Sequence, residues 1–177
     1  MLDKFKYSDK EIKELIDSMV ILVDSREKSN MHVTEWFDKK GIKWKKKALE
    51  RGDYSFIIPK NEALSIPRDL DFSNEIMLER KNSLEEISGN LTKERDRIEK
   101  ELSLAPPNKV ILIENASFHD IVTGNYDTKY DRKAFMASLF TFWFRYNVPI
   151  FFMPNAEETG LFLRLYFEYF LKAKILK

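Results

Sequence analysis

The sequence contains no cysteine and only two histidines among its 177 residues. Without cysteine there is no disulfide, no thiolate nucleophile and no cysteine-ligated zinc, so any metal has to be bound by oxygen or imidazole. The two histidines, His32 and His119, are far apart in the chain and are expected to be surface or packing residues rather than a metal-binding pair. The five glycines form no glycine-rich loop, which disfavours a nucleotide hydrolase.

Long hydrophobic runs and a charge excess are also missing. No stretch of about 18 uncharged apolar residues occurs, and the N-terminal residues are too charged for a signal peptide. These absences predict a protein without a membrane segment, located in the cytoplasm, or in the nucleus if the source is eukaryotic. The formal net charge is +1, from 30 basic and 29 acidic residues, so any nucleic-acid surface has to be local.

Three clusters of basic residues could provide such a local surface. Each cluster taken alone is typical of a solvated face. The clusters are Lys39, Lys40, Lys43, Lys45, Lys46 and Lys47; Lys93, Arg95, Arg97 and Lys100; and Lys129, Arg132 and Lys133.

Hydrophobic periodicity predicts alternating strands and helices. With 44% hydrophobic residues, including 14 Phe, the chain can form one compact domain. Strands are expected at 19–23, 42–49, 54–58, 75–81, 110–113 and 149–153, and helices at 8–18, 30–40, 83–104, 132–146 and 156–174. A loop or excursion is expected at 59–74 and a turn at 124–125. This alternation is typical of a layered α/β fold.

The predicted strand at 19–23 is followed by a charged group, Asp24, Arg26 and Glu27. In α/β sheets ligands bind at the outer ends of strands, so Asp24 could bind a metal ion or contact DNA. An arginine beside two carboxylates can fix their charge state and their orientation. For Asp24 alone, a turn-forming or helix-capping role is the simpler explanation.

A second charged group is expected from Asp53 together with the predicted strand at 75–81. Asp53 follows Gly52 between two extended segments, where a tight turn would also explain both residues. Alternation along the strand places Glu79 and Lys81 on one face of the sheet and Arg80 on the other. A charged strand edge that resists aggregation is the alternative explanation for these three residues.

Two carboxylates and a lysine together provide what phosphodiester hydrolysis requires. The reaction needs a hard divalent cation to neutralise the phosphate, a generated hydroxide, and a cationic group near the developing charge. Magnesium prefers oxygen ligands and keeps several waters, so Asp53, Glu79 and the backbone carbonyl of Arg80 would suffice on the protein side, with Asp24 as a further candidate ligand. Lys81 would position the attacking water or stabilise the transition-state phosphate.

Three segments, in this order, resemble the nuclease-domain signature of the XPF and Hef family of structure-specific endonucleases. They are Val-Asp-Ser-Arg-Glu at 23–27, Gly-Asp-Tyr at 52–54 and Glu-Arg-Lys at 79–81. The resemblance extends over residues 20–171, because 88–102 is similar to the family's basic helix, and 144–150 and 157–159 are similar to its later helix, strand and helix. It implies a restriction-endonuclease-like fold, a three-layer α/β/α core with a mixed central sheet.

The resemblance also implies a magnesium- or manganese-dependent endonuclease that hydrolyses DNA at flaps, forks or junctions, in recombination, repair or replication. It identifies the metal ligands with Asp53 and Glu79, and the catalytic lysine with Lys81. The complete expected active site is Asp24, Arg26, Glu27, Asp53, Glu79 and Lys81. Side chains expected to contact DNA are Arg80, Lys93, Arg95, Arg97 and Lys133.

Two positions depart from the family pattern. The spacer from Asp53 to Glu79 is longer than usual, which predicts an inserted loop or hairpin at about 60–74, and Glu85 stands where an aspartate is typical. Residues 1–177 are expected to form a single stand-alone nuclease domain without a helicase or helix-hairpin-helix module. Such compact versions resemble phage- or mobile-element-encoded members of the family.

Two other functions stay open: a non-catalytic DNA-binding or scaffolding subunit on the same fold, and a site-specific endonuclease of restriction type that reads base edges. A homodimer through the C-terminal helices is expected, because the helices at 132–146 and 156–174 carry more aromatic residues than one core-facing stripe requires. A separate helicase or recombinase could be a further partner.

Overall fold

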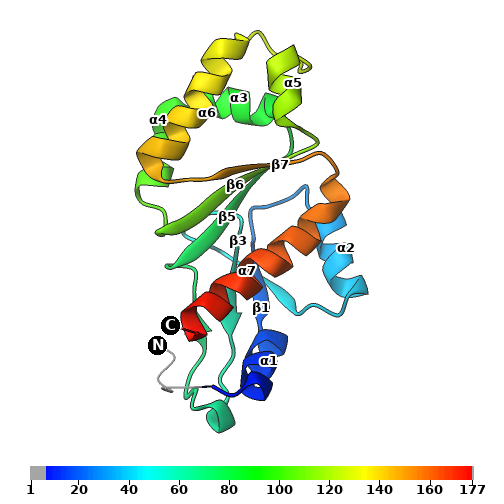
Figure 1. The fold of residues 1–177 in the computed structure, drawn as a ribbon, viewed down its shortest axis with the longest axis vertical. Coiled ribbons are helices and arrows are strands. Elements are labelled where there is room, and N and C mark those ends of the chain that lie inside the picture. Colours follow the sequence, from blue (N-terminus) through cyan, green and yellow to red (C-terminus); the bar gives the residue numbers. More distant parts are fainter. Residues whose placement is uncertain (1–6, 177) are drawn as a thin grey trace.

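Seven strands form one mixed sheet in the computed structural model, which describes residues 7–176 (Figure 1). In chain order the strands are β1 (Val20–Asp24), β2 (Trp44–Lys47), β3 (Tyr54–Ile58), β4 (Leu70–Asp71), β5 (Ile76–Lys81), β6 (Asn108–Glu114) and β7 (Ile150–Met153). The sheet has the order β2-β1-β3-β5-β6-β7, and β4 pairs with β3 beside this path. β3 is antiparallel to β1 and β5, whereas β1 and β2, and also β5, β6 and β7, run parallel. The predicted mixed sheet is confirmed.

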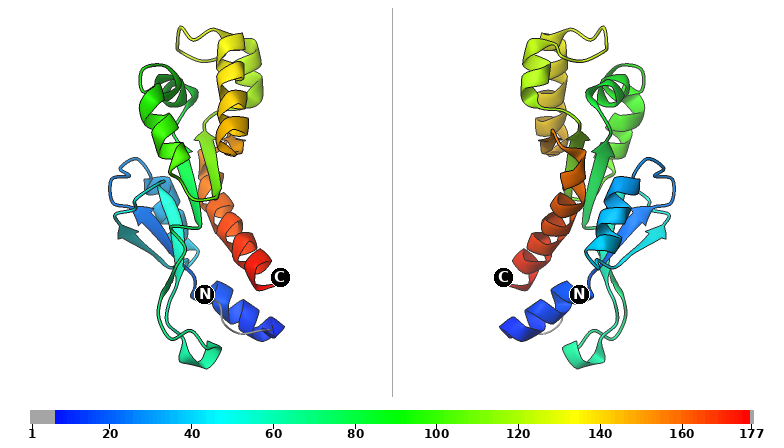
Figure 2. Two further views of the ribbon diagram at one scale, coloured as in Figure 1. Left: turned by 90° about the vertical axis from the view of Figure 1, so that its left-hand side faces the viewer. Right: turned by 90° about the vertical axis from the view of Figure 1, so that its right-hand side faces the viewer.

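Helices cover both faces of this sheet, which confirms the predicted three-layer α/β/α arrangement. The helices are α1 (Asp9–Ser18), α2 (Met31–Lys39), α3 (Leu84–Thr92), α4 (Arg95–Ser103), α5 (Phe118–Thr123), α6 (Arg132–Tyr146) and α7 (Thr159–Ile175). α1, α2 and α7 pack on one face, around a core that includes Ile21, Phe56 and Leu78. α3 to α6 pack on the other face, where Met77 and Ile111 belong to their core. In the side views α7 runs diagonally toward α1, which it contacts (Figure 2).

Helix caps and glycine positions explain why several elements begin and end where the sequence predicts. Ser8 and Glu11 form the predicted capping box at the start of α1. The Asp131 side chain accepts a hydrogen bond from the backbone N–H of Ala134 and begins α6. Asn147, in the left-handed conformation, ends that helix, so the predicted helix at 132–146 is confirmed.

The single helix predicted at 83–104 is wrong, because the chain breaks between α3 and α4. The backbone N–H groups of Lys93 and Glu94 both donate to the carbonyl of Gly89, at 2.9 and 3.3 Å, so the regular helical pattern stops there. The Asn90 side chain donates to the Glu94 carboxylate at 2.8 Å and stabilises the break. Glycine and asparagine are poor helix formers, which weakens the helix at this point. Because of the break, α3 and α4 are separate helices.

Residues 59–74 form a hairpin-like excursion at the end of the molecule that also contains α1 (Figure 1). Asn61 and Ile66 form an isolated antiparallel bridge around the short 3-10 helix η1 (Glu62–Leu64), and β4 then returns to pair with β3. The Asn61 side chain donates to the Glu14 carboxylate of α1 at 3.0 Å. The segment is therefore an ordered extension of the sheet, within the range where the sequence predicts an inserted loop or hairpin.

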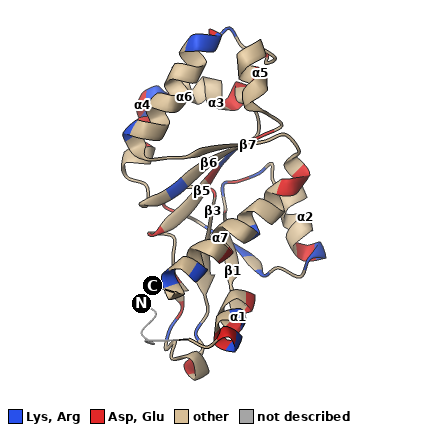
Figure 3. Cartoon of the chain, viewed as in Figure 1, with Lys and Arg blue, Asp and Glu red and all other residues tan. Residues whose placement is uncertain are grey.

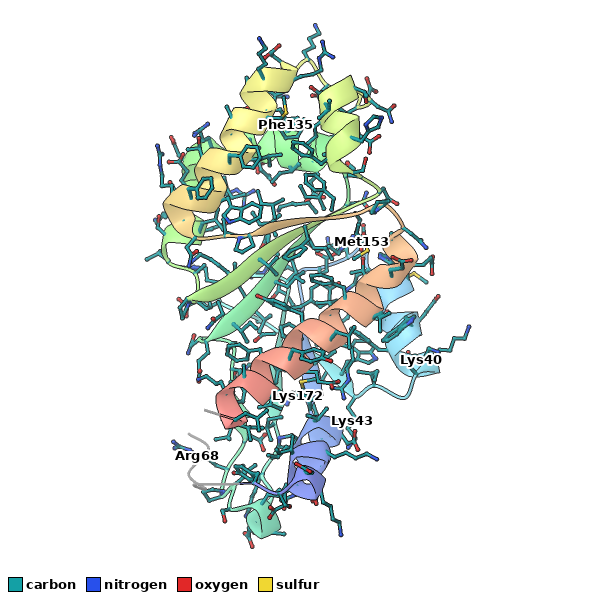
Figure 4. The ribbon with its side chains drawn as sticks, viewed as in Figure 1. Lys40, Lys43, Arg68, Phe135, Met153 and Lys172 are labelled. Atoms are coloured by element: carbon teal, nitrogen blue, oxygen red, sulfur yellow. The ribbon has the colours of Figure 1, made fainter. Side chains whose placement is uncertain are left out.

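The α5–α6 region has a helix that the sequence does not predict. Ser117 and Asp120 form a capping box at the start of α5, and Gly124 ends it in the left-handed conformation. Six residues are too few to show a helical period, so only the turn at Gly124 was expected. The following loop is ordered because Tyr126 and Tyr130 pack on the ring of the fully buried Phe135 (Figure 4).

The C-terminal helix begins slightly later than the sequence predicts. A 3-10 turn, η2 (Ala156–Glu158), precedes α7, so the regular helix begins later than the predicted residue 156. Between residues 7 and 176, none of the helices combines the length and apolar character that a bilayer crossing requires.

Candidate active site

The predicted active-site residues come from the end of β1, the turn before β3, and β5. On β5, Met77 belongs to the core under α3 to α6 and Leu78 to the core under α1, α2 and α7. Because side chains alternate along a strand, Glu79 and Lys81 share the face of Met77, and Arg80 lies on the opposite face. This is the arrangement that the sequence predicts for β5.

Backbone hydrogen bonds hold Asp53 between β1 and β5. Its N–H donates to the carbonyl of Leu78 at 2.9 Å, and its carbonyl accepts from the N–H of Asp24 at 2.8 Å. Its carboxylate accepts from the backbone N–H of Arg80 at 2.7 Å. Gly52 has φ +72°, and a Cβ at this position would approach the Met77 side chain to 2.8 Å. Only glycine fits this turn, and the turn places Asp53 beside Glu79.

The charges of this group depend on one another. Burial and the neighbouring charge of Glu79 raise the pKa of Asp53 well above its usual range, although the Arg80 N–H and the charge of Lys81 oppose the shift. Burial lowers the pKa of Lys81, but the charge of Glu79 and the hydrogen bond to it outweigh burial and raise this pKa overall. The Lys81 ammonium donates to the Glu79 carboxylate at 2.8 Å. Two carboxylates held together in this way are electrostatically unfavourable without a bound cation.

The donor set fits a magnesium-type cation rather than a fully protein-ligated metal. Nowhere in residues 7–176 do three His, Asp or Glu side chains converge into a preformed metal cage. Magnesium commonly uses one or two carboxylates and completes its octahedron with water and substrate oxygens. Asp53 and Glu79 meet that requirement, and neither histidine nor cysteine lines the cavity with them.

Asp24 is buried, and protein donors occupy its carboxylate. One oxygen accepts from the backbone N–H of Leu49 at 2.9 Å, and the other accepts from the Arg26 side chain at 2.7 Å. Arg26 also donates to the carbonyl of Leu49 at 2.8 Å, so both residues fasten the loop between β2 and β3 to the end of β1. The hydrogen bond and the charge of Asp24 raise the pKa of Arg26. The Asp24 carboxylate also accepts from the backbone N–H of Arg26 at 3.3 Å, which is the turn-forming role considered from the sequence. Asp24 also lines the site.

A cavity of about 220 Å³ joins these residues into one site. β1 and the loop after it, the β2–β3 loop, β5 and α4 form its wall. The lining residues are Asp24, Arg26, Glu27, Glu50, Arg51, Gly52, Asp53, Met77, Glu79, Arg97, Ile98, Glu101 and Leu102. Five of the six predicted active-site residues line it, and the sixth, Lys81, is hydrogen-bonded to Glu79.

The Arg80 side chain does not point into this cavity, which corrects its expected role in DNA contact. Its guanidinium is 3% exposed and is engaged by Glu27 at 2.7 Å, by Glu114 at 2.5 Å and by the carbonyl of Ser29 at 2.7 Å. Glu79 and Lys81 lie on one face of the sheet, the catalytic face, and strand alternation directs Arg80 to the opposite face. Glu27 and Glu114 neutralise the Arg80 charge. Its backbone still contributes to the site, because its N–H binds Asp53.

Glu114 is a buried acid that sequence reasoning missed. Its carboxylate, fully enclosed, accepts hydrogen bonds from Arg80 and from Thr159 at 2.5 Å each, and it pairs with the ring of His32 at 2.9 Å. It thus connects β5 and β6 to α2 and α7 and fixes the guanidinium that holds Glu27. An acid directly after the apolar run 110–113 was the available signal, but its partners lie far away in sequence.

The basic residues predicted to contact DNA occupy different environments. Arg97 lines the cavity, whereas Arg95 lies over the ring of Phe142 at 5.2 Å. Lys93 is exposed at the break before α4. Lys133 is exposed on the first turn of α6, and it is not one of the residues that line the cavity.

Glu85, where the family typically has aspartate, contacts a different part of the chain. Its carboxylate accepts from the backbone N–H of Asp127 at 2.8 Å, and this bond lowers its pKa. Glu85 therefore holds the loop between α5 and α6 rather than lining the cavity.

Comparison with known proteins identifies the family and the fold of this chain. The family model of the ERCC4 domain matches residues 23–166. The fold resembles XPF from Aeropyrum pernix at 18% sequence identity, with a TM-score of 0.61 over 85% of this chain and 60% of that chain. It also resembles XPF from Aeropyrum pernix in complex with DNA at 18% identity, with a TM-score of 0.62 over 87% of this chain and 66% of that chain.

The chain thus spans less than two thirds of the archaeal XPF chains that it resembles, at 60% and 66%. No curated protein sequence matches it. The family model, however, covers most of the chain and contains every predicted active-site residue, from Asp24 to Lys81. On this basis the chain belongs to the ERCC4 domain family and folds as an XPF-type nuclease domain.

Proposed function

We propose that this nuclease domain is a magnesium- or manganese-dependent endonuclease that hydrolyses phosphodiester bonds in DNA. The observation that carries the proposal is the position of Asp53 beside Glu79, which is hydrogen-bonded to Lys81. Asp53 and Glu79 line a cavity formed by the end of β1, the β2–β3 loop, β5 and α4. Burial, and after it the neighbouring charge of Glu79, raise the pKa of Asp53, and two carboxylates held side by side favour a divalent cation. Membership of a nuclease family agrees with this reading.

A bound divalent cation would be held by Asp53 and Glu79 and would supply Lewis-acid activation of the phosphate. The other groups orient these ligands: the Arg80 N–H holds Asp53, and Lys81 holds Glu79. Because its pKa is raised, Lys81 stays protonated at neutral pH and can only act as a hydrogen-bond donor and positive charge. It is therefore assigned to the developing charge on the phosphate, or to orienting the attacking water, and not to removing a proton.

Arg26 is the exposed arginine of the site, and we assign it to binding a phosphate of the substrate. The Arg26 side chain is 70% exposed although its Nε is bound to Asp24. It lines the cavity and can donate from its outer nitrogens to a phosphate of the bound strand. The ion pair with Arg80 fixes the Glu27 carboxylate, which adds a negative charge to the lining of the cavity.

We further propose branched DNA, such as flaps, forks or junctions, as the substrate, in recombination, repair or replication. This extension follows from the family signature at 23–27, 52–54 and 79–81. One archaeal XPF with a similar fold has been solved with DNA. A homodimer through the C-terminal helices and a separate helicase or recombinase complete the proposal. The intact set of two carboxylates and lysine argues against a purely scaffolding subunit.

The test is to incubate the purified protein with flap, fork, four-way junction and linear duplex DNA, with magnesium, manganese, calcium or a chelator. Cleavage of the branched substrates in magnesium or manganese is expected, with binding but little cleavage in calcium. The Lys81→Ala and Glu79→Gln variants are expected to lose about 10²–10³ in rate while binding DNA.

Each other result has a definite meaning. Undiminished cutting in chelator would reject a metal-dependent site. Binding without cleavage in any metal would favour a scaffolding subunit, and cleavage of linear duplex at fixed sequences would favour the restriction-type alternative.

A further inference from the structure

β2 lies beside the active site, and the proposed mechanism makes no use of it. Three of its four residues, Lys45, Lys46 and Lys47, are exposed lysines. In the described part of the chain β2 pairs only with β1, so it forms one edge of the sheet. The chain then runs directly into Glu50 and Arg51, which line the active-site cavity. The positive edge strand and the catalytic cavity are thus consecutive in sequence and neighbours in space.

The register with β1 decides which of these lysines face the active site. Lys45 is paired with Leu22, and Lys47 with Asp24, which lines the cavity. Paired residues on neighbouring strands share a face, so the Lys45 and Lys47 side chains lie on the catalytic face. Lys46 is paired with Val23, whose side chain belongs to the core under α2 and α7, and therefore lies on the opposite face.

The catalytic face is open near β2. Its local core is small and consists of Leu22, Leu49 and Ile57. Lys47 crosses this face to reach Asp71 on β4, which is paired with Ile57 on β3. This ion pair is partly exposed, with side-chain exposures of 42% and 39%, so Lys47 stays accessible to another anion.

Carboxylates neutralise the lysines of β2 less than they neutralise the basic residue of α4 that lines the cavity. Arg97, the basic residue of α4 that lines the cavity, is ion-paired with Glu94 and with Glu101. Within residues 7–176, no carboxylate forms an ion pair with Lys45 or Lys46. Along α1 and α4, basic residues are interspersed with acidic ones (Figure 3).

The positive surface continues away from the active site. Lys39 and Lys40 end α2, and Lys40 and Lys43 project from the periphery of the molecule (Figure 4). A four-residue strand is about 13 Å long. That length corresponds to about four nucleotide steps at about 3.4 Å each. A strand of nucleic acid leaving the cavity along β2 would therefore pass several lysines.

We propose that Lys45 and Lys47 form a phosphate-binding strip, which holds the backbone of the DNA substrate next to the scissile phosphate. The proposal rests on the proposed function, because it takes DNA as the substrate. Lysine contacts to phosphate position the nucleic acid without reading its sequence. The strip therefore acts in substrate binding and does not touch the reacting atoms.

The neighbouring lysine provides the matched control. Lys45→Gln and Lys46→Gln remove the same charge from exposed positions of one strand, but from opposite faces. DNA binding is measured by fluorescence anisotropy with a labelled flap substrate in calcium, over a series of salt concentrations. For Lys45→Gln the slope of log affinity against log salt is expected to become shallower by about 0.9, and by about twice that in the Lys45→Gln/Lys47→Gln double variant. Lys46→Gln is expected to keep the wild-type slope, and Lys45→Arg to restore binding.

Equal losses for Lys45→Gln and Lys46→Gln would overturn the assignment to one face, and no loss in either would remove the strip altogether. Unchanged DNA binding combined with lost sedimentation on anionic phospholipid vesicles would assign the lysines to a lipid surface instead. Because binding is measured without turnover, a wild-type protein that binds through Lys45 and never cleaves in magnesium would overturn the nuclease proposal alone. At saturating protein, the single-turnover cleavage rate of Lys46→Gln is expected to equal that of wild type, because Lys46 lies on the opposite face of the sheet.

Discussion

The carboxylate of Asp53 lies beside Glu79, and burial and that neighbouring charge raise its pKa. In the metal-free protein, Asp53 therefore keeps its proton to higher pH when folded than when unfolded. The free energy of unfolding consequently falls as pH rises from the unfolded pKa, about 3.9, through the raised folded pKa. A buried carboxylate at this position thus costs stability in the metal-free protein.

For this reason Asp53→Asn is expected to melt higher than wild type at pH 7 in chelator, while losing cleavage activity. Asparagine can still accept the hydrogen bond from the Arg80 N–H, and each kcal/mol relieved corresponds to about 2–4 °C in Tm for a domain of this size. The advantage should vanish below about pH 4, where Asp53 is protonated in both states. Thermal unfolding at the two pH values measures this, and a less stable variant at pH 7 would contradict the electrostatic argument.

Glu114 gives a second prediction at the residue scale. Removing its carboxylate in Glu114→Ala leaves the buried Arg80 guanidinium with Glu27 as its remaining carboxylate partner. Breaking a buried ion pair from one side costs about 3–5 kcal/mol, a large part of the stability of a typical domain. Urea unfolding measures the loss. Thr159→Val removes only one hydrogen bond to Glu114 and should cost less. A loss below about 1 kcal/mol in Glu114→Ala would show that the network is not structurally important.

α4 shows how the course of one helix determines which side chain reaches the site. Arg95 and Arg97 are two positions apart, about 200° around a helix, so they cannot face the same surface. Arg95 packs over Phe142 and pairs with Glu99, whereas Arg97 lines the cavity. The rotation along α4 therefore separates two arginines that the sequence groups together.

We accordingly expect Arg97→Gln to weaken DNA binding and flatten its salt dependence by nearly one unit, and Arg95→Gln to lower stability with little change in binding. Arg95→Gln should lower stability because it removes the cation–π contact with Phe142, which contributes about 0.5–2 kcal/mol to the free energy of unfolding. Anisotropy titrations and thermal unfolding of both variants separate the two effects. Equal binding losses would mean that α4 contacts DNA along its whole length.

For the whole molecule, the apolar surface is concentrated around the edge strand β7. A groove of about 590 Å³ lies along α7 and is lined in part by Phe151, Leu165 and Tyr169. A second apolar cavity of about 270 Å³, lined by Phe140 and Phe152 among others, lies between α6 and β7. Phe151 and Tyr169 are 45% and 62% exposed, and exposed apolar surface next to an unpaired strand edge is typical of an association surface.

We therefore propose that the expected homodimer forms through β7 and the C-terminal helices. Light scattering after gel filtration at micromolar concentration should give twice the chain mass of 21.1 kDa. Tyr169→Asp should shift the protein to a monomer, because it introduces a charge into the groove. Leu104→Asp, at a comparably exposed position just after α4, should leave the dimer intact. A wild-type protein that stays monomeric at high concentration, with or without DNA, would refute the dimer.

The sequence by itself determined most of the elements and the face of β5 that carries Glu79 and Lys81. Period-two alternation is a local property, so the placement of Glu79 and Lys81 opposite Arg80 follows from the chain itself. Most strands and helices follow in the same way, because burial repeats every second residue in a strand and every third or fourth in a helix. The family signature then identified the acids and the lysine as one site.

Only the tertiary structure decided which distant groups meet. His32 and Glu114 are 82 residues apart, and no local pattern records their contact. Likewise, the break at Lys93 and the β1–β2 register decide that Arg97 and Lys45 face the catalytic side. Such contacts depend on how whole elements pack and pair, and a one-residue shift of register would move a side chain to the opposite face of the sheet.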